Sequence, residues 1–344
     1  MNRAVDIPVP TLKDGWRRRD AFQRAMVLAL ATFAFLACVA SLGFGAMPIG
    51  LGTVLESLAH AIGLESSSLS AVDYGVVTQL RAPRVALGFA VGATLGLAGA
   101  AMQGMFRNPL ADPGLIGVSA GAGAGAASVI ILLDVAAIAL LGPFAWLGVS
   151  LAAFVGGLGA TALVYAIGSV GGTSRVAVML LAGIALNSVV GAYTGFLVFA
   201  ADDAQLRSLT FWTLGSVGEA SWSMVTVAGI GLLGSGLLIY PQRHALNAWL
   251  LGESQVHHLG FSLVQTRRAL IVGAALAVSI AVAVAGAVSF VGLVVPHMAR
   301  LVVGSNHERL LPASVLLGGG LLVLADAIAR TLVAPAEMPL SVIT

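Results

Sequence analysis

Hydrophobic and polar positions alternate along this chain in long blocks. The block from Val85 to Phe106 runs 22 residues without a charge and breaks at Arg107-Asn108-Pro109. Because an α-helix rises about 1.5 Å per residue, a block of this length can cross a bilayer. The polar loop then predicts a turn, since proline cannot continue a helix. A second apolar block begins near Gly114 and predicts a span that runs back.

The same pattern predicts nine spans in all. They cover about 25–45, 85–106, 114–133, 145–167, 175–201, 222–240, 269–288, 290–304 and 311–333. The apolar segment from Ile49 to Ile62 is too short to cross and predicts an interfacial helix. Residues 1–24 then form a tail before the first span, and residues 25–344 form a single membrane domain.

Glycines recur at every fourth position in two of these spans. They stand at positions 88, 92 and 96 and at positions 117, 121 and 125. Each series leaves a stripe without side chains, which lets another helix approach closely within the membrane. Charged residues make up only 9% of the chain, against about a quarter in a soluble domain. The sequence therefore predicts an all-α polytopic membrane protein.

The distribution of charge predicts the orientation. The first 24 residues hold six Lys or Arg against three Asp, and such an excess keeps that end in the cytoplasm. Most acidic loop residues fall on the opposite side. A secretory signal is the alternative, but the uncharged stretch from Ala25 to Leu55 exceeds the roughly 7–15-residue core of a signal peptide. We expect a multi-pass membrane protein with a cytoplasmic amino terminus.

A weak internal repeat accompanies these spans. A shift of 187 positions (296 − 109) pairs Pro109 with Pro296 and Arg81-Ala82 with Arg268-Ala269. Five spans separate the copies, and this odd number turns the second copy upside down, as in the inverted repeats of transporters. After Pro339 the chain ends where another helix would begin, so we expect the sequence to be cut short before a tenth helix.

Enzyme chemistry finds no support in the sequence. The only lysine, Lys13, lies in the tail, so a GxxxxGK[ST] phosphate loop is excluded and ATP would have to bind another chain. His257 and His258 are adjacent and point about 100° apart on a helix, which favours a polar surface over a metal pair. The single cysteine, Cys38, excludes a disulfide framework. We predict no catalytic residue, metal site or cofactor, and no nucleic-acid partner.

Charged residues near the outer side allow two interpretations. Asp326 and Arg330 lie four apart on one helical face, which favours a structural ion pair over a proton relay. Arg81, Arg84 and Arg330 lie on the outer side, against the general trend. From these residues alone, interfacial anchoring and docking of acidic residues from an external partner are equally open.

On the inner side, the segment from Leu251 to Leu263 is short and amphipathic. Gly252 and Gly260 interrupt it, and its apolar positions Val256 and Leu259 recur at helical spacing. A short helix of this kind inserts into a groove of a cytoplasmic partner. A plain connector is the alternative.

Several motifs together resemble the FecCD-type permeases of bacterial importers for vitamin B12, ferric siderophores and haem. They are RAPR at 81–84, MQGMFRNPLADPGLIGVSAGAG at 102–123, LAGIALN at 181–187, LGESQVHHLG at 251–260, FVGLVVPHMAR at 290–300 and LADAIAR at 324–330. The resemblance implies a homodimer of ten-helix, BtuC-like subunits with an inverted repeat, set in the lipid of a bacterial inner membrane. It also implies two copies of a cytoplasmic ATP-binding subunit and a periplasmic binding protein.

The resemblance further implies residue roles and a cargo. Arg81, Arg84 and Arg330 match the arginines that receive glutamates of the binding protein. The coupling helices cover about 245–263, and the residues that would contact the ATPase are Gly252, Glu253, Val256, Leu259 and Gly260. FRNPLADPGLIGVS and DDAQLRSLTFWTLGS look most like haem permeases, so we expect haem from a periplasmic haem-binding protein. Ferric siderophore or cobalamin is the alternative cargo, and a proton-coupled secondary transporter is the alternative class.

Overall fold

The computed structural model describes residues 12–45, 47, 49–64, 69–133, 145–169, 176–333 and 336–344. Helices are the only regular elements in these ranges. In chain order they are α1 (Leu12–Gly43), α2 (Leu51–Ala61), α3 (Ala71–Gly75), the π-helical η1 (Val76–Arg81), α4 (Ala82–Phe106), η2 (Pro113–Ile116), α5 (Val118–Leu132), α7 (Ala145–Gly168), α8 (Val176–Ala200), α9 (Asp203–Leu214), α10 (Trp222–Ile239), η5 (Tyr240–Gln242), α11 (Arg243–Trp249), α12 (Glu253–His258), α13 (Leu263–Ala285), α14 (Val291–Val303), α15 (His307–Ala329) and α16 (Leu340–Ile343).

The described helices occupy the places of the predicted spans. Seven stretches are long and apolar enough to cross a membrane, and the shorter apolar helices α5 and α14 fill the remaining two places. The interfacial helix expected before the second span is α2. Helix α1 begins at Leu12, well inside the predicted tail. The tenth helix stays a prediction.

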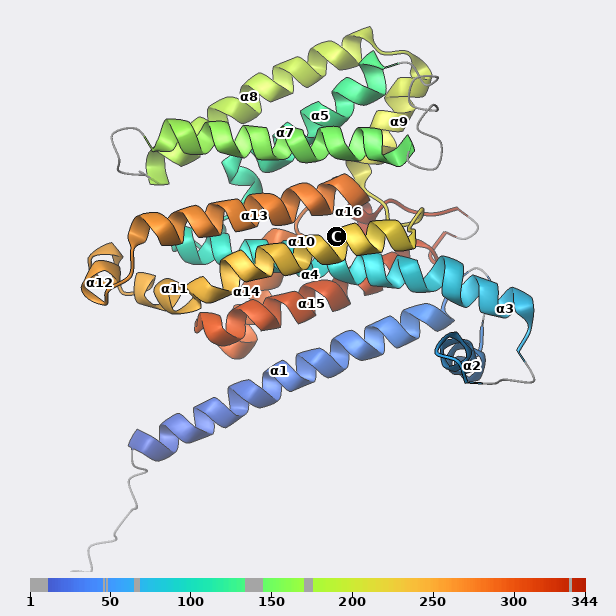
Figure 1. Ribbon diagram of the computed structural model, residues 1–344, viewed down its shortest axis with the longest axis horizontal. Helices are drawn as coiled ribbons and strands as arrows, with labels where there is room; N and C mark the ends of the chain where they lie inside the picture. The colour runs from blue at the N-terminus through green and yellow to red at the C-terminus, as the bar shows by residue number, and fades with distance from the viewer. Residues whose placement is uncertain are drawn as a thin grey trace, which may run out of the picture.

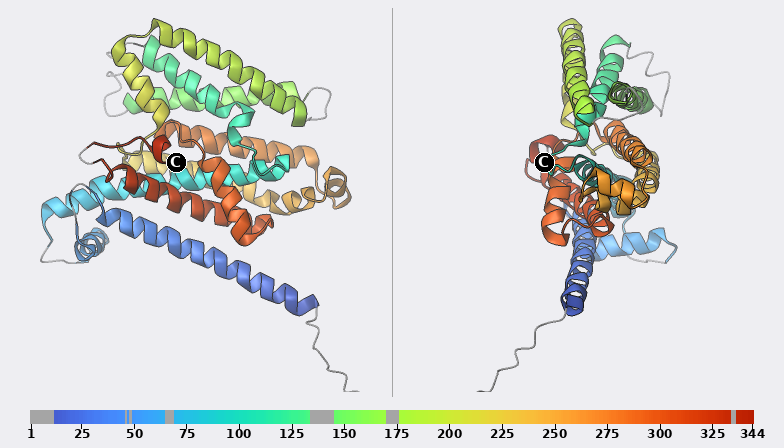
Figure 2. Two further views of the ribbon diagram at one scale, coloured as in Figure 1. Left: turned by 180° about the vertical axis from the view of Figure 1, so that it is seen from behind. Right: turned by 90° about the vertical axis from the view of Figure 1, so that its left-hand side faces the viewer.

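Helix α4 forms the centre of the bundle (Figure 1). It packs against α10, α13, α14 and α15, and its apolar stretch is almost entirely buried. Helices α5, α7 and α8 form a separate layer that reaches this core mainly through α13, while α1 lies on the other side against α15 (Figure 2). The mainly small and apolar side chains of α4 explain its position, because such a helix is covered on every face.

The glycine stripe on α4 is the surface that receives α15. A Cβ added at Gly92 would overlap the backbone oxygen of Gly318, and one added at Gly96 would overlap that of Ser314. The two backbones touch at these points, as the spacing of the glycines predicts. Two glycines of the second series, Gly121 and Gly125 on α5, approach the backbone of α7 in the same way.

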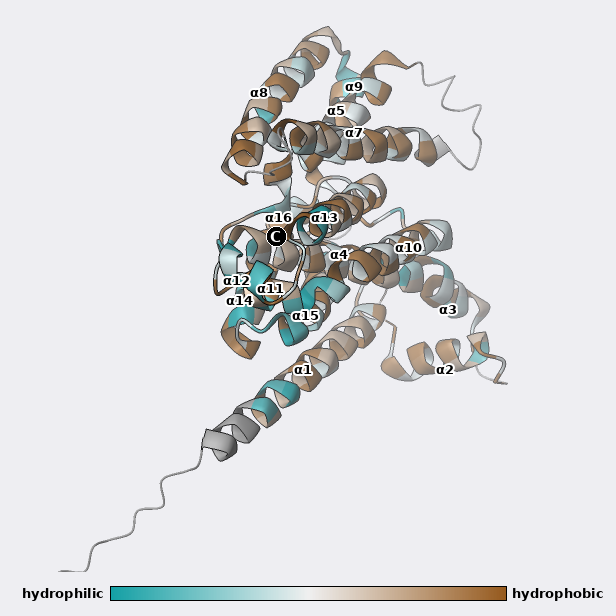
Figure 3. Cartoon of the chain, turned by 60° about the vertical axis from the view of Figure 1, so that its left-hand side comes forward, coloured by the Kyte–Doolittle hydropathy of each residue, from teal (hydrophilic) through white to brown (hydrophobic). Residues whose placement is uncertain are grey.

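Different helices lie at the two ends of the bundle. Helices α11 and α12 and the start of α15 lie at one, which we call the α12 end, whereas α2, α9 and α16 lie at the other, the α9 end (Figure 1). Hydrophilic residues gather on α11, α12 and the start of α15 (Figure 3). The helices paired by the predicted repeat, α4 and α13, run in opposite directions. However, Pro109 lies in a loop and its match Pro296 lies inside α14.

Candidate functional site

Arg81 lies at the α9 end, at the last position of η1. Its buried guanidinium donates to the backbone oxygens of Leu42, at 2.7 Å, and Gly43, at 2.9 Å. It also donates to the Met47 oxygen. The last carbonyl groups of a helix lack intrahelical partners and attract a cation. Arg81 therefore fixes the end of α1 and the segment after it.

Arg84, on the first turn of α4, pairs with two carboxylates. Its Nε donates to both oxygens of Asp326 at 3.0 Å, and a terminal nitrogen donates to Asp326 Oδ1 at 2.8 Å. The terminal nitrogens also donate to Glu337 Oε1 at 2.7 Å and Oε2 at 3.1 Å. The Asp326 side chain is 3% exposed and that of Glu337 is 49% exposed. The Glu337 carboxylate therefore covers the ion pair between Arg84 and Asp326 on the side that faces solvent.

Arg330 follows the end of α15 and is also buried. Its Nε lies 3.8 Å from Asp326 Oδ2, one turn earlier on the same helix. A terminal nitrogen donates to the backbone oxygen and the hydroxyl group of Ser41 on α1. The ion pair expected between Asp326 and Arg330 is confirmed, but Arg84 is the closer partner of Asp326.

These five residues, Arg81, Arg84, Asp326, Arg330 and Glu337, form what we call the arginine cluster. Three guanidinium groups against two carboxylates give the cluster a net positive charge. Arg84 and Arg330 pair with the carboxylates, whereas Arg81 binds main-chain oxygens. Hydrogen bonds from Arg84 hold the pKa of Glu337 below its usual value, so this carboxylate stays ionised. Because the arginines are largely buried, an acidic group that arrives from outside meets Glu337 first.

At the α12 end, two glycines set the bounds of α12. Gly252 precedes the helix with φ 115°, and Gly260 follows it with φ 83°. No atom lies within 4 Å of a Cβ added at either position, so the requirement for glycine is conformational. Residues with a side chain rarely adopt such angles. The glycines that interrupt the amphipathic pattern therefore make α12 a short helix with sharp turns on both sides.

Helix α12 is tied to the bundle on one face and free on the other. Val256 is fully buried, whereas the Leu259 side chain is 58% exposed. Glu253 pairs with Arg267 of α13 at 3.0 Å, and the Arg267 guanidinium lies 5.3 Å from the ring centre of the buried Trp249. The expected contact residues thus divide into inward anchors and an exposed apolar position.

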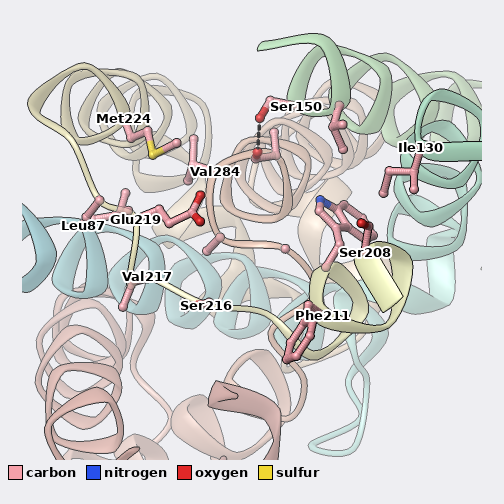
Figure 4. Close-up of a pocket in the computed structure, with 16 residues that line it drawn as sticks. Leu87, Ile130, Ser150, Ser208, Phe211, Ser216, Val217, Glu219, Met224 and Val284 are labelled. Atoms are coloured by element: carbon pink, nitrogen blue, oxygen red, sulfur yellow. Dashed lines mark hydrogen bonds between the residues drawn. The ribbon is translucent and has the colours of Figure 1, made fainter. Parts of the chain in front are cut away.

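Two cavities flank the carboxyl-terminal half of α13. The first, of about 460 Å³, is lined by α9, α10 and the end of α13, and Ser208, Glu219 and Met224 surround it (Figure 4). The second, of about 470 Å³, lies beside η2 and the start of α14 and holds Asp112 and Asn187 among apolar neighbours.

The structure thus brings the three predicted arginines together and places the predicted coupling residues on one short helix and the turns on either side of it. Sequence reasoning missed Glu337 and Ser41, which bind two of these arginines. Glu337 stands in the EMP segment just before Pro339, which carried no recognisable motif. Sequence reasoning also missed Asn247, whose side chain hydrogen-bonds to the start of α15.

Known proteins resemble this chain both in sequence and in structure. Residues 33–344 match the profile of the FecCD transport family. The hemin transport system permease protein HmuU of Yersinia pestis is 40% identical over 287 residues, which cover 82% of this chain and 83% of the relative. The cobalamin import system permease protein BtuC of Halobacterium salinarum is 38% identical over 317 residues, covering 87% and 82%. A solved structure of a metal-chelate type ABC transporter in an inward-facing conformation superposes with a TM-score of 0.79 at 28% identity, covering 93% of this chain and 94% of that one.

Proposed function

Because this chain belongs to the FecCD transport family and is therefore a permease subunit of a type II ABC importer, we propose that its cargo is haem. The observation that carries the proposal is the 40% identity to the Yersinia pestis hemin permease over 82% of this chain. The protein hydrolyses nothing itself; ATP hydrolysis belongs to a separate chain.

Energy enters at the α12 end. Two copies of an ATP-binding subunit contact α12 from the cytoplasm, with one on each subunit of a permease homodimer. The exposed Leu259 offers an apolar contact, and the turns at Gly252 and Gly260 hold α12 away from the bundle. Val256 and Glu253 fasten α12 to the permease, so that a movement imposed on the helix is passed inward.

Cargo enters at the α9 end from a periplasmic haem-binding protein. Its acidic side chains dock on the arginine cluster, where Arg81, Arg84 and Arg330 leave a net positive charge. Charge-assisted hydrogen bonds to guanidinium groups give attraction and register together. Because the arginines are largely buried, the binding protein contacts the cluster at its exposed edge, where Glu337 lies.

Cobalamin is the second candidate cargo, because the Halobacterium salinarum cobalamin permease is nearly as similar, at 38% identity. Ferric siderophores are a third cargo that family members carry. A proton-coupled secondary transporter, which would need no ATP-binding subunit, is the alternative of another class.

Uptake by the reconstituted system tests these alternatives directly. The permease, its ATP-binding subunit and its binding protein are placed in proteoliposomes, and uptake of hemin, cyanocobalamin and a ferric siderophore is compared. We expect hemin uptake that requires ATP inside the vesicles. Preferential uptake of cyanocobalamin would show that cobalamin, and not haem, is the cargo. Uptake driven by a proton gradient without ATP would contradict the ATP-driven mechanism.

A further inference from the structure

Helix α11 connects the exposed helix α12 to the membrane bundle. Leu246 and Trp249 of α11 are fully buried, whereas five of the six residues of α12 are exposed. A movement imposed on α12 from outside can therefore reach the bundle through α11, in addition to the Glu253–Arg267 contact with α13. The contacts that α11 makes decide which further membrane helix receives that movement.

Asn247 of α11 holds the start of α15 through both atoms of its amide. Its Oδ1 accepts a hydrogen bond from the His307 backbone nitrogen at 2.8 Å and lies 2.9 Å from His307 Nδ1. Its Nδ2 donates to Asn306 Oδ1 at 2.8 Å. Hydrogen bonds are directional, so the set fixes the orientation of α15 relative to α11 as well as the distance.

Asn306 serves this contact and the helix end at once. It is the N-cap of α15, and its Oδ1 accepts a hydrogen bond from the Glu308 backbone nitrogen at 3.0 Å. The same oxygen therefore caps α15 and binds Asn247. His307 is fully buried, and a Cβ added at Gly104 of α4 would lie 2.5 Å from its Nε2. Helices α4, α11 and α15 thus meet at one tightly packed point.

The far end of α15 lies in the arginine cluster. The helix has 23 residues and, at about 1.5 Å per residue, spans about 33 Å. Asp326 and Arg330, near its last turn, bind Arg84 and Ser41. One continuous helix therefore carries the Asn247 contact at its start and the arginine cluster at its end.

We propose that Asn247, Asn306 and His307 form a joint that transmits movement of α12 to α15, and so links nucleotide hydrolysis to the state of the arginine cluster. The inference rests on the proposed function, in which an ATP-binding subunit contacts α12. The three side chains are positioning residues, because they act through α15 and contact neither cargo nor nucleotide. Reciprocity follows from thermodynamic linkage: a partner bound at the α9 end changes the affinity of the ATP-binding subunit for nucleotide through the same joint.

A second contact between the same two helices supplies a matched control. His244 Nδ1 lies 3.3 Å from Glu308 Oε1, and the two side chains are 50% and 42% exposed. Exposed ion pairs contribute little to coupling, because solvent screens them and both side chains lose entropy. His244→Ala therefore removes an α11–α15 contact without removing the joint.

Substitutions at Asn306 separate the joint from helix capping. Serine and aspartate both cap a helix well. Serine is one bond shorter than asparagine and does not reach Asn247, whereas aspartate keeps an acceptor oxygen at the same place. A residue that only caps α15 would tolerate both changes equally. A residue of the joint would tolerate only Asn306→Asp.

The experiment uses the full complex in proteoliposomes and measures two ratios. One is hemin moved per ATP hydrolysed, and the other is the stimulation of ATP hydrolysis by the binding protein. We expect Asn247→Ala and Asn306→Ser to lower both ratios about tenfold, and Asn306→Asp and His244→Ala to leave them near wild type. Thermal unfolding and recovery of the ATP-binding subunit on purification verify that each variant is folded and assembled.

If Asn306→Ser and Asn306→Asp give equal ratios, Asn306 acts only as a helix cap and the proposed joint is wrong. A loss in His244→Ala as large as that in Asn247→Ala would also overturn it. Stimulation of ATP hydrolysis does not depend on the cargo, so it tests the joint even where wild type fails to move hemin. Only failure of wild type to bind an ATP-binding subunit would overturn the proposed function and the joint together.

Discussion

The guanidinium group of Arg84 donates to both carboxylate oxygens of Glu337, at 2.7 and 3.1 Å. Glu337 is the half-exposed member of a cluster whose other members are largely buried. It occupies the position that an acidic side chain of a docking partner would take on Arg84. The permease thus carries its own acidic ligand on a predicted docking arginine.

Replacing Glu337 with glutamine should strengthen docking of the binding protein. A neutral amide competes less well for Arg84 than a carboxylate does, because charge-assisted hydrogen bonds are about twice as strong. We expect the Kd for the binding protein to fall about threefold, measured by surface plasmon resonance on nanodisc-embedded permease. Glu219→Gln, at the same end but lining a cavity, is the control. An unchanged or higher Kd for Glu337→Gln would contradict docking at Arg84.

The Glu337 pair should also make stability depend on pH. The folded protein holds the pKa of Glu337 below its unfolded value, so the pair stabilises fully above about pH 4.3 and its contribution is lost as the pH falls through the folded pKa. The group is half-exposed, so the effect is small. Between pH 7 and pH 3.5 the Tm of wild type should fall about 1–2 °C more than that of Glu337→Gln. Parallel Tm curves for the two proteins would exclude this contribution.

Removing Asp326 should be far more damaging. Its carboxylate is 3% exposed and balances Arg84 and Arg330 in the interior. Loss of one partner leaves uncompensated buried charge, which typically costs about 3–5 kcal/mol. We expect Asp326→Ala to give little folded protein, and detergent-solubilised material to unfold at a much lower temperature. Thr331→Ala, on the following exposed turn, should behave as wild type.

Substitution of Gly252 should disturb α12 without creating any clash. Its φ of 115° is unfavourable for alanine, and no atom lies within 4 Å of the added Cβ. The strain is of order 1–2 kcal/mol, and rotation of α12 relieves it. Recovery of the ATP-binding subunit with Gly252→Ala should therefore drop severalfold. Gly236→Ala is the matched control, since it also has open space but lies within α10. Equal recovery with both variants would show that the angle at Gly252 does not matter for assembly.

The helices could be placed from the sequence, whereas their side-chain pairing could not. Uncharged blocks predict spans because hydrocarbon thickness fixes helix length, and α4, α8 and α10 begin and end close to the expected residues. Arg84 and Asp326 are 242 positions apart, and their pairing depends on how α4 packs on α15. Helical periodicity shows which residues share a face of one helix. It does not show which face of a distant helix lies opposite.

In the arginine cluster, too, the sequence predicts contacts within one helix but not contacts between helices. The spacing of Asp326 and Arg330 predicts their pair, because neighbours four apart share a helical face. The main-chain oxygens that bind Arg81 belong to the end of another helix and leave no trace in sequence composition. Asn247 and Asn306 are likewise ordinary polar residues until the fold brings α11 to the start of α15.

Helices α5 and α14 have only 15 and 13 residues, so each extends about 20 Å, whereas the hydrocarbon layer measures about 30 Å. Peptide groups beyond such a truncated helix would meet lipid tails unless protein or solvent covers them. The cavity of about 470 Å³ adjoins η2, which precedes α5, and the segment that leads into α14. Water in this cavity would hydrogen-bond to the peptide groups beyond the ends of α5 and α14. The barrier to ions and polar solutes would then be thinner than the full hydrocarbon layer, because only the part without water would contribute to it.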